Sequence, residues 1–300
     1  MYIENTDKSF YSFNDYLKEK YNCKVYRLPI NAGLTCPNRI NGGTGCIFCD
    51  EEGSGATFYP ENISSIAEQV KYSIDLFTLK RKAKKFYVYF QSFTNTFAPV
   101  EELKKIYDSA LIDDRIAGII IGTRPDCVDD EKIKMIKFSY SDKYDVWIEL
   151  GLQSAHNSTL KFINRGHSVE DFVSANEICL KYDIKTTAHI IIGLPYETEK
   201  MMLETGQFVA NQKCAGIKIH SLYIIKNTVL HKFYEKEKFK LLTMDEYARI
   251  TAEILKMLPD KTVIHRITGE TDKVKIVAPD WVNDKNSVIC KIKHFYNFFP

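Results

Sequence analysis

The sequence predicts an α/β fold in which a parallel sheet curls into a complete or partial barrel. Seven short apolar runs rich in β-branched residues recur along the 300 residues. Longer segments of helical character separate them, so strand and helix alternate about every 30 residues, which is the rhythm of repeated βαβ units. This rhythm favours a barrel over an open sheet. The predicted strands are residues 24–30, 86–90, 117–122, 145–150, 189–194, 216–224 and 261–267.

The hydrophobic pattern inside these runs supports parallel pairing. Segments such as AGIIIG (117–122) and HIIIGL (189–194) are continuously apolar. A strand with one solvated face alternates between apolar and polar residues, whereas a strand buried on both faces does not. We therefore expect both faces of the sheet to be covered.

Three of the intervening segments carry helix start signals. Ser65 with Glu68 and Thr243 with Glu246 have the spacing of capping boxes before apolar-periodic segments. The segment 99–111 begins with proline and two acidic residues, which suit a helix amino terminus. We expect helices to begin at all three places.

The chain shows no repeat, low-complexity tract or linker, and we expect one catalytic domain with appendages. Residues 1–23 are predicted to form a helical N-terminal extension, residues 24–267 the core barrel, and residues 268–300 a helical C-terminal cap. The lysine- and aromatic-rich segment 225–242 interrupts the strand–helix rhythm and is interpreted as an insertion or a lid.

Composition narrows the class of protein. The chain is 45% hydrophobic and 27% charged, as globular proteins are, and its net charge of +2 does not identify a nucleic-acid partner. No run of 18 apolar residues occurs, and MYIENTDKSF lacks the core of a signal peptide, so we expect a cytoplasmic protein without a membrane partner. In that compartment eight cysteines favour a metal or redox role over a disulfide framework.

Three of these cysteines lie in one glycine-rich loop that directly follows the first predicted strand. Cys36, Cys46 and Cys49 have the spacing C-x9-C-x2-C, and six glycines lie between positions 33 and 55. A structural zinc ion normally has four ligands, so a fourth would have to come from elsewhere in the chain. A cubane iron–sulfur cluster held by three cysteines instead leaves one iron open. The candidates for a fourth zinc ligand are Cys23, Cys127 and His167.

The segment LTCPNRINGGTGCIFC resembles the cluster motif of the radical S-adenosylmethionine (SAM) superfamily, with the widened spacing of the catalytic subunit of Elongator. More closely, the chain resembles the bacterial YhcC/YtqA-type proteins over nearly its whole length. The resemblance implies the partial (β/α)6-type TIM-like barrel of the radical SAM core, with helical N- and C-terminal extensions. The segments that carry it, in order, are CPNR, GCIFC, GSG, YFQSFTNTFAP, TRPDC, ELGLQS, INRGHS, IIIGLPYET and APDW.

The resemblance implies that Cys36, Cys46 and Cys49 ligate a 4Fe-4S cluster and that SAM binds the open iron. One electron then cleaves SAM to methionine and a 5′-deoxyadenosyl radical, which abstracts hydrogen from the substrate. The cofactors supply this chemistry, while the protein orients them and excludes side reactions. Phe48, between the last two cysteines, is expected to shield the cluster and pack on adenine, with a plain core aromatic as the alternative.

The resemblance also implies residues that bind SAM. After the second strand the family presents polar groups to the methionyl ammonium, but the usual Gly-Gly-Glu is absent here, and which residue replaces it stays open. Arg165 is expected to hold the methionyl carboxylate as a bidentate pair, with a surface arginine at a helix end as the alternative. The full expected set is Phe48, Gln91, Ser92, Thr94, Asn95, Glu149, Gln153, Arg165, Ile191 and Gly193.

Arg124, Asp126 and Cys127 of TRPDC follow the third predicted strand and are the main candidates for contact with the substrate. The alternative is a structural Arg–Asp pair. His167, Tyr223, His265 and Glu197 are further polar residues near the predicted strand ends.

Three classes of function follow. The preferred one is a radical SAM enzyme that acts on an unknown substrate, with a tRNA base as a candidate because of the likeness to Elongator, and with flavodoxin or ferredoxin as the reducing partner. The second is a zinc-binding structural or nucleic-acid module. The third is an ordinary α/β barrel enzyme in which the cysteines are incidental and an acid–base pair such as His167 with Asp126 acts.

Overall fold

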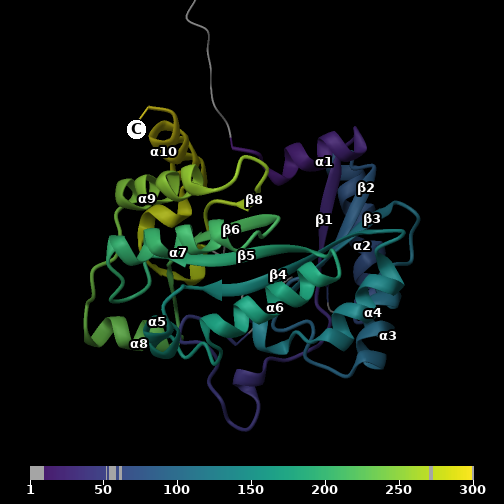
Figure 1. Cartoon of the computed structure of the whole chain (residues 1–300), viewed down its shortest axis with the longest axis horizontal. Coiled ribbons are helices and arrows are strands. Elements are labelled where there is room, and N and C mark those ends of the chain that lie inside the picture. The colour runs from purple at the N-terminus through teal and green to yellow at the C-terminus, as the bar shows by residue number, and fades with distance from the viewer. Residues whose placement is uncertain (1–9, 52, 54–58, 61–62, 270–272, 299–300) are drawn as a thin grey trace, which may run out of the picture.

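The computed structural model describes residues 10–51, 53, 59–60, 63–269 and 273–298. Its central feature is a curled sheet of seven parallel strands that follow one another in the order β1-β2-β3-β4-β5-β6-β8 (Figure 1). Each strand pairs only with its neighbours in this order, and the intervening helices are the crossovers that parallel pairing requires. The prediction of an α/β fold with a partial barrel is confirmed. The strands are β1 (Val25–Ile30), β2 (Lys85–Phe90), β3 (Ile116–Thr123), β4 (Asp145–Gln153), β5 (Lys185–Ile192), β6 (Gly216–Ser221) and β8 (Val263–Arg266).

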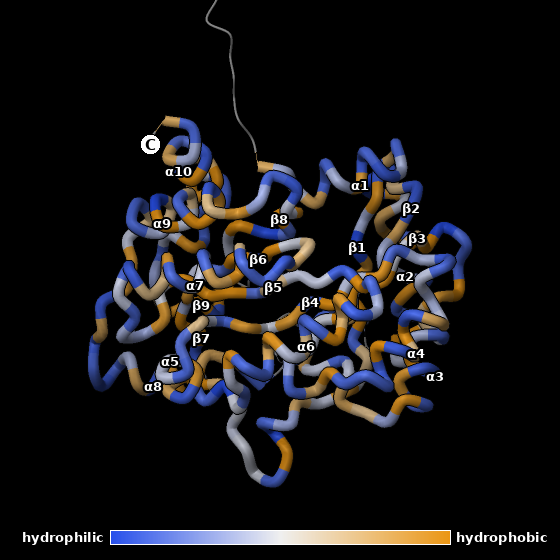
Figure 2. The backbone as a smooth tube through the Cα atoms, in the orientation of Figure 1, coloured by the Kyte–Doolittle hydropathy of each residue, from blue (hydrophilic) through white to orange (hydrophobic). Residues whose placement is uncertain are grey.

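Helices cover the outer face of this sheet, where they bury the apolar side chains of the strands. Figure 2 shows the hydrophobic strands gathered in the middle of the molecule. The capping boxes at Ser65 and Thr243 are present as predicted, and a helix begins directly after Pro99. The helices are α1 (Phe13–Tyr21), α2 (Ile66–Arg81), α3 (Val100–Ala110), α4 (Asp130–Tyr140), α5 (Asn157–Phe162), α6 (Val169–Lys181), α7 (Glu199–Asn211), α8 (Val229–Lys236), α9 (Met244–Met257) and α10 (Lys285–Phe298).

The two faces of the sheet carry different side chains. Val88, Ile119 and Ile148 belong to the core between strands and helices. The neighbouring residues Tyr87 and Trp147 belong to a separate cluster inside the curl. Successive side chains of a strand point to opposite faces, so the aromatic and polar residues of the apolar runs turn inward together.

Helix α1 closes the end of the curl at which the strands begin. The Phe13 ring stacks on the His265 ring with centroids 4.3 Å apart and meets the Trp147 ring edge-on at 5.9 Å. The Tyr16 hydroxyl donates to Asp145 at the start of β4 over 2.7 Å. Just before the helix, the Tyr11 carbonyl accepts a hydrogen bond of 2.8 Å from the Ile264 amide of β8. Residues 11–21 of the predicted extension therefore pack against the barrel, while residues 1–9 lie outside the described part of the chain.

The predicted strand 216–224 was wrong in its last part. β6 ends at Ser221, and β7 (Ile224–Ile225) pairs antiparallel with β9 (Ile276–Ala278) in a separate two-stranded ribbon. The segment 225–242 contains α8, and the Leu230 amide of α8 donates to the Ile47 carbonyl of the cysteine loop over 2.8 Å. This segment therefore supports the loop that carries the cysteines.

At the C-terminal end, α10 packs on α9 (Figure 1). The division of the chain at residues 23 and 267 stays a prediction. The helices that the structure describes include none that is both long and apolar enough to span a bilayer.

Candidate active site

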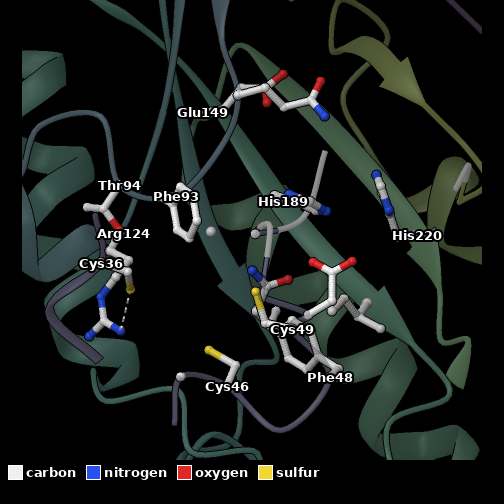
Figure 3. A pocket seen from close by; sticks show the side chains of 18 of the residues that line it. Cys36, Cys46, Phe48, Cys49, Phe93, Thr94, Arg124, Glu149, His189 and His220 are labelled. Carbon is white, nitrogen blue, oxygen red and sulfur yellow. Dashed lines mark hydrogen bonds between the residues drawn. The ribbon is translucent and has the colours of Figure 1, made fainter. Parts of the chain in front are cut away.

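A cavity of about 710 Å³ opens at the end of the barrel at which the strands finish. Parallel α/β barrels carry their reactive groups at this end because the loops after the strands converge there. Figure 3 shows Cys36, Cys46, Phe48 and Cys49 at one end of the cavity and Glu149 at the other, with His189 and His220 between them. We call the first group the cysteine end. The inner end is lined by Glu149, His189, Lys218, His220, Ser221 and Arg266.

The three cysteines converge because of tight turns in the loop. Cys36 precedes a short 3-10 helix (Pro37–Arg39), and the Cys49 amide donates to the Cys46 carbonyl over 3.0 Å. None of the three forms a disulfide bond in the described part of the chain; Cys36 and Cys46 are buried and Cys49 is half-buried. Their sulfur atoms face the same space in Figure 3.

No three His, Cys, Asp or Glu side chains of the described residues lie close enough together to hold a single metal ion. A structural zinc ion needs four ligands around one point, at about 2.0–2.3 Å. A cubane cluster does not require its cysteines to meet at one point, because each cysteine ligates a different iron atom.

Nitrogen donors surround the buried sulfur atoms. The Arg165 guanidinium lies 3.5 Å from Cys46 Sγ, and the Arg124 guanidinium lies 3.9 Å from Cys36 Sγ. The Asn38 amide is a second donor to Cys46 Sγ, at 3.9 Å. Cysteine binds metal as a thiolate, and N–H groups beside a thiolate ligand offset its negative charge. The donor set therefore suits sulfur ligands that carry negative charge.

The same Asn38 side chain joins the cysteine loop to the segment that contains Arg165. Its amide donates to the carbonyls of Asn164 and Arg165 over 2.7 and 2.9 Å, and the Asn164 amide donates back to the Gly45 carbonyl over 2.7 Å. Gly166 makes room for this contact, because a Cβ there would lie 2.1 Å from Asn38 Oδ1. The motifs CPNR and NRGH, which are far apart in the sequence, therefore contact each other in the fold.

Arg165 is held against β4 by the Gly151 carbonyl, which accepts hydrogen bonds of 2.8 and 3.3 Å from its guanidinium. A Cβ on Gly151 would lie 2.4 Å from the Arg165 guanidinium, so any other residue here would force this guanidinium to shift. His167 Nε2 also lies 2.9 Å from the Gly151 carbonyl, and burial together with Arg165 lowers the pKa of His167 to about 4. His167 is a neutral structural side chain beside the site.

Arg124 lines the cavity, but the other two candidates for substrate contact in TRPDC do not. Arg124 forms a two-point ion pair with Asp126, at 2.9 and 2.7 Å. Burial by itself lowers the pKa of Arg124, but the Asp126 carboxylate outweighs burial and keeps this pKa above its usual value. Asp126 and Cys127 are not among the described residues that line the cavity, and burial raises the pKa of the Cys127 thiol to about 12. The alternative of a structural Arg–Asp pair fits this geometry, and burial disfavours the thiolate form of Cys127.

The inner end contains a buried ion pair. Lys218 Nζ of β6 lies 3.0 Å from Glu149 Oε2 of β4 and donates to the Tyr89 hydroxyl of β2 over 2.5 Å. Burial lowers the pKa of Lys218 to about 8. Burial by itself raises the pKa of Glu149, but Lys218 and His265 outweigh it and hold this pKa well below its usual range. Both groups are therefore charged at neutral pH.

Comparison with known families identifies the chain. Residues 30–209 match the family described as the radical SAM superfamily, and residues 214–295 match the radical SAM C-terminal domain. The chain belongs to the radical SAM superfamily. It is therefore a radical SAM enzyme, and its substrate is open. The family implies a 4Fe-4S cluster and SAM as cofactors.

Three relatives show the range of similarity. The uncharacterized protein YtqA of Bacillus subtilis is 37% identical over 289 residues, which cover 95% of this chain and 88% of YtqA. A tRNA uridine(34) acetyltransferase of Methanocaldococcus jannaschii is 28% identical over 182 residues, 59% of this chain and 32% of that protein. The structure of archaeal Elp3 from Methanocaldococcus infernus superposes with a TM-score of 0.67 at 18% identity, over 91% of this chain and 63% of that chain. The last comparison shows a shared fold.

The residues expected to bind SAM divide into two groups in this radical SAM fold. Ser92, Asn95 and Gly193 do not line the cavity in the described part of the chain. The Asn95 amide instead donates to the carbonyls of Ser92 and Gly122, over 3.0 and 2.9 Å, and so shapes the loop after β2. The expected residues that do line the cavity are Phe48, Gln91, Thr94, Glu149, Gln153, Arg165 and Ile191.

Several residues of the site were missed by sequence reasoning. Asn38 lies in the motif CPNR, and the sequence pattern gives it no role in the site. The same holds for residues of the predicted strands that line the cavity, namely Tyr89, His189, Lys218, His220 and Arg266. His189 and Ile191, like Lys218 and His220, are two positions apart on one strand. An inward-facing period of two within the apolar runs was the signal that could have identified them.

Proposed function

We propose that Cys36, Cys46 and Cys49 hold a 4Fe-4S cluster at the cysteine end and that SAM occupies the cavity beside it. When bound, these cofactors supply a 5′-deoxyadenosyl radical that abstracts hydrogen from the substrate. The observation that carries the proposal is the set of three cysteines that line one end of the cavity, two of them beside buried arginine guanidinium groups. Nitrogen donors to the sulfur atoms stabilise the thiolate ligands and shield them from water.

The chain's own residues orient SAM in this proposal. Arg165 is fixed by the Gly151 carbonyl, and its cation lies at the cysteine end, where a methionyl carboxylate would bind. Gln91 and Thr94, after β2, line the cavity and offer acceptors to the methionyl ammonium in place of the missing Gly-Gly-Glu. Phe48 and Ile191 provide apolar surface for adenine. Flavodoxin or ferredoxin would supply the electron.

The test is anaerobic purification, reconstitution with iron and sulfide, and a count of iron per chain. We expect about four irons and slow formation of 5′-deoxyadenosine from SAM and dithionite, detected by mass spectrometry. Cys46→Ala should lose both properties. Cys290→Ala, which changes an exposed cysteine on α10, should lose neither. One tightly bound zinc ion, with no iron uptake and intact SAM, would overturn the proposal in favour of the zinc module.

A tRNA base is the candidate substrate. The tRNA uridine(34) acetyltransferase relative supports it, as does a basic aromatic surface near α8. Tyr196, Phe233 and Phe239 stack or meet edge-on there, and Lys238 lies 4.4 Å above the Tyr234 ring. Lysines contact phosphates, and aromatic rings stack on exposed bases. Binding of total tRNA that weakens steeply with salt, and weakens further in Lys238→Glu, would support this substrate, and salt-independent or absent binding would contradict it.

A further inference from the structure

The inner end of the cavity contains buried polar atoms without partners. The rings of His189 on β5 and His220 on β6 lie side by side, with centroids 4.3 Å apart (Figure 3). Their Nε2 atoms and the Ser221 hydroxyl are buried and have no hydrogen-bond partner among the described residues. Ser221 is only 2% exposed. Buried polar groups without partners are rare in folded proteins, so three of them on one cavity wall indicate a group that binds there.

Both imidazoles are neutral at physiological pH. Burial lowers the pKa of His189 to about 3, and the pKa of His220 lies well below its usual range for the same reason, helped by His189 beside it. A neutral imidazole keeps one N–H donor. The inner end therefore offers two ring N–H groups and one hydroxyl from adjacent strands.

The inner end also has an uncompensated positive charge. The inner end contains two cations, Lys218 and Arg266, and Lys218 pairs with Glu149 at 3.0 Å. Arg266 on β8 lines the same cavity, adjacent in register to Lys218. In the described part of the chain its guanidinium has no hydrogen-bond or ion-pair partner. Arg266 is half-buried, and an anion in the cavity would give its guanidinium a counterion.

We propose that the inner end binds an oxyanion of the substrate, a carboxylate or a phosphate, through Arg266, His189, His220 and Ser221. The inference rests on the proposed function, because it places the methionine portion of SAM at the cysteine end. The uncharged adenosine portion would satisfy the N–H and O–H donors but would leave Arg266 without a counterion. The enzyme therefore selects substrates that carry an anionic group, which enters the barrel first and stops between β5, β6 and β8.

Nuclear magnetic resonance of the full chain with ¹³C-labelled histidine tests the inference. The signals of His189 and His220 are assigned with His189→Gln and His220→Gln, and His156 and His231 serve as references because they do not line the cavity. Sodium acetate and sodium phosphate are titrated separately against sodium chloride at constant ionic strength and pH 7. The titration is run with and without the cluster, so its outcome does not depend on whether the chain cleaves SAM.

We expect acetate, phosphate or both to shift the His189 and His220 signals saturably while the reference signals stay in place. The anion that binds more tightly identifies the chemistry of the substrate group. Arg266→Gln should weaken binding about tenfold or more, Arg266→Lys should weaken it less, and Ser221→Ala should weaken it if Arg266→Gln fails to fold. The matched control is Arg249→Gln. Arg249 pairs with Glu199 and does not line the cavity, so this substitution should leave anion binding unchanged. No saturable shift with either anion, or unaltered binding in a folded Arg266→Gln protein, would overturn the inference.

Discussion

At the scale of single residues, the cysteine end depends on contacts that keep cations beside sulfur. Arg165 reaches Cys46 Sγ only because Gly151 leaves room for its guanidinium. Lys218 and Glu149 form a buried pair at the other end of the cavity, with each side chain 4% exposed. Each of these residues has a substitution whose effect the geometry predicts.

Gly151→Ala is expected to lower the rate of 5′-deoxyadenosine formation about tenfold or more. The new Cβ would lie 2.4 Å from the present position of the Arg165 guanidinium, so the guanidinium must shift away from Gly151 and Cys46. The far-ultraviolet circular dichroism should be unchanged, because alanine is compatible with a strand. A normal rate together with an unaltered electron paramagnetic resonance spectrum of the reduced cluster would contradict this role of glycine.

Lys218→Met is expected to destabilise the protein by roughly 3–5 kcal/mol, because it leaves the buried Glu149 carboxylate without its lysine partner. Urea unfolding at pH 7 measures the change. Lys104→Met breaks an exposed pair with Asp108 and should cost no more than about 1 kcal/mol. Equal losses in the free energy of unfolding for the two substitutions would show that the buried pair stabilises the protein no more than the exposed pair does.

At the scale of elements, α1 is joined to the barrel through Asp145. This carboxylate accepts hydrogen bonds from Tyr16 of α1, Tyr87 of β2 and Lys185 of β5, over 2.7, 2.6 and 2.7 Å. Burial by itself raises the pKa of Asp145, but these donors outweigh burial and lower it to about 2. A helix that was predicted to be an N-terminal extension is thus joined to three other elements by one side chain.

A dependence of stability on pH follows from this lowered pKa. Between about pH 4 and pH 2 the unfolded chain binds a proton at Asp145 and the folded chain does not, so stability falls as the pH falls through this window. The loss should be about 2 kcal/mol. The measurement is urea unfolding at several pH values for the parent and for Asp145→Asn. The difference between the two should shrink below pH 4, and a difference that stays constant with pH would contradict the assignment.

At the scale of the whole molecule, one sheet runs through residues 30–209 and residues 214–295, the two parts of the chain that match different domain families. β5 lies in the first region and β6 in the second, yet they pair along six residues from Thr187 to Ile192. α10 packs on α9, and the Trp281 ring lies against the Tyr247 ring of α9, with centroids 5.3 Å apart. The two regions share one core.

We therefore expect the chain to unfold in one cooperative transition. The two tryptophans report on different regions, Trp147 on β4 and Trp281 near α10. Trp147→Phe and Trp281→Phe each leave one fluorescent reporter, and their urea midpoints, corrected for the stability cost of each substitution, should coincide. An earlier transition at Trp281 would show that the C-terminal region opens separately.

The sequence by itself determined the strands, the capped helices and the cysteine loop, because each of these depends on residues that are close along the chain. Apolar runs predicted β2 to within one residue, and the spacing of Cys36, Cys46 and Cys49 marked the site. Boundaries were less certain where two structures compete for one apolar run. Residues 216–224 were divided between the main sheet and a ribbon with β9, a strand more than 50 residues further along.

Only the tertiary structure decided which side chains line the cavity. Arg165 meets Cys46 across 119 residues, and Lys218 meets Glu149 across 69. Such contacts depend on strand register and on which face of each strand turns inward, and continuously apolar runs do not reveal that face. The inner end, with His189, His220 and Arg266 on three adjacent strands, exists because the sheet curls.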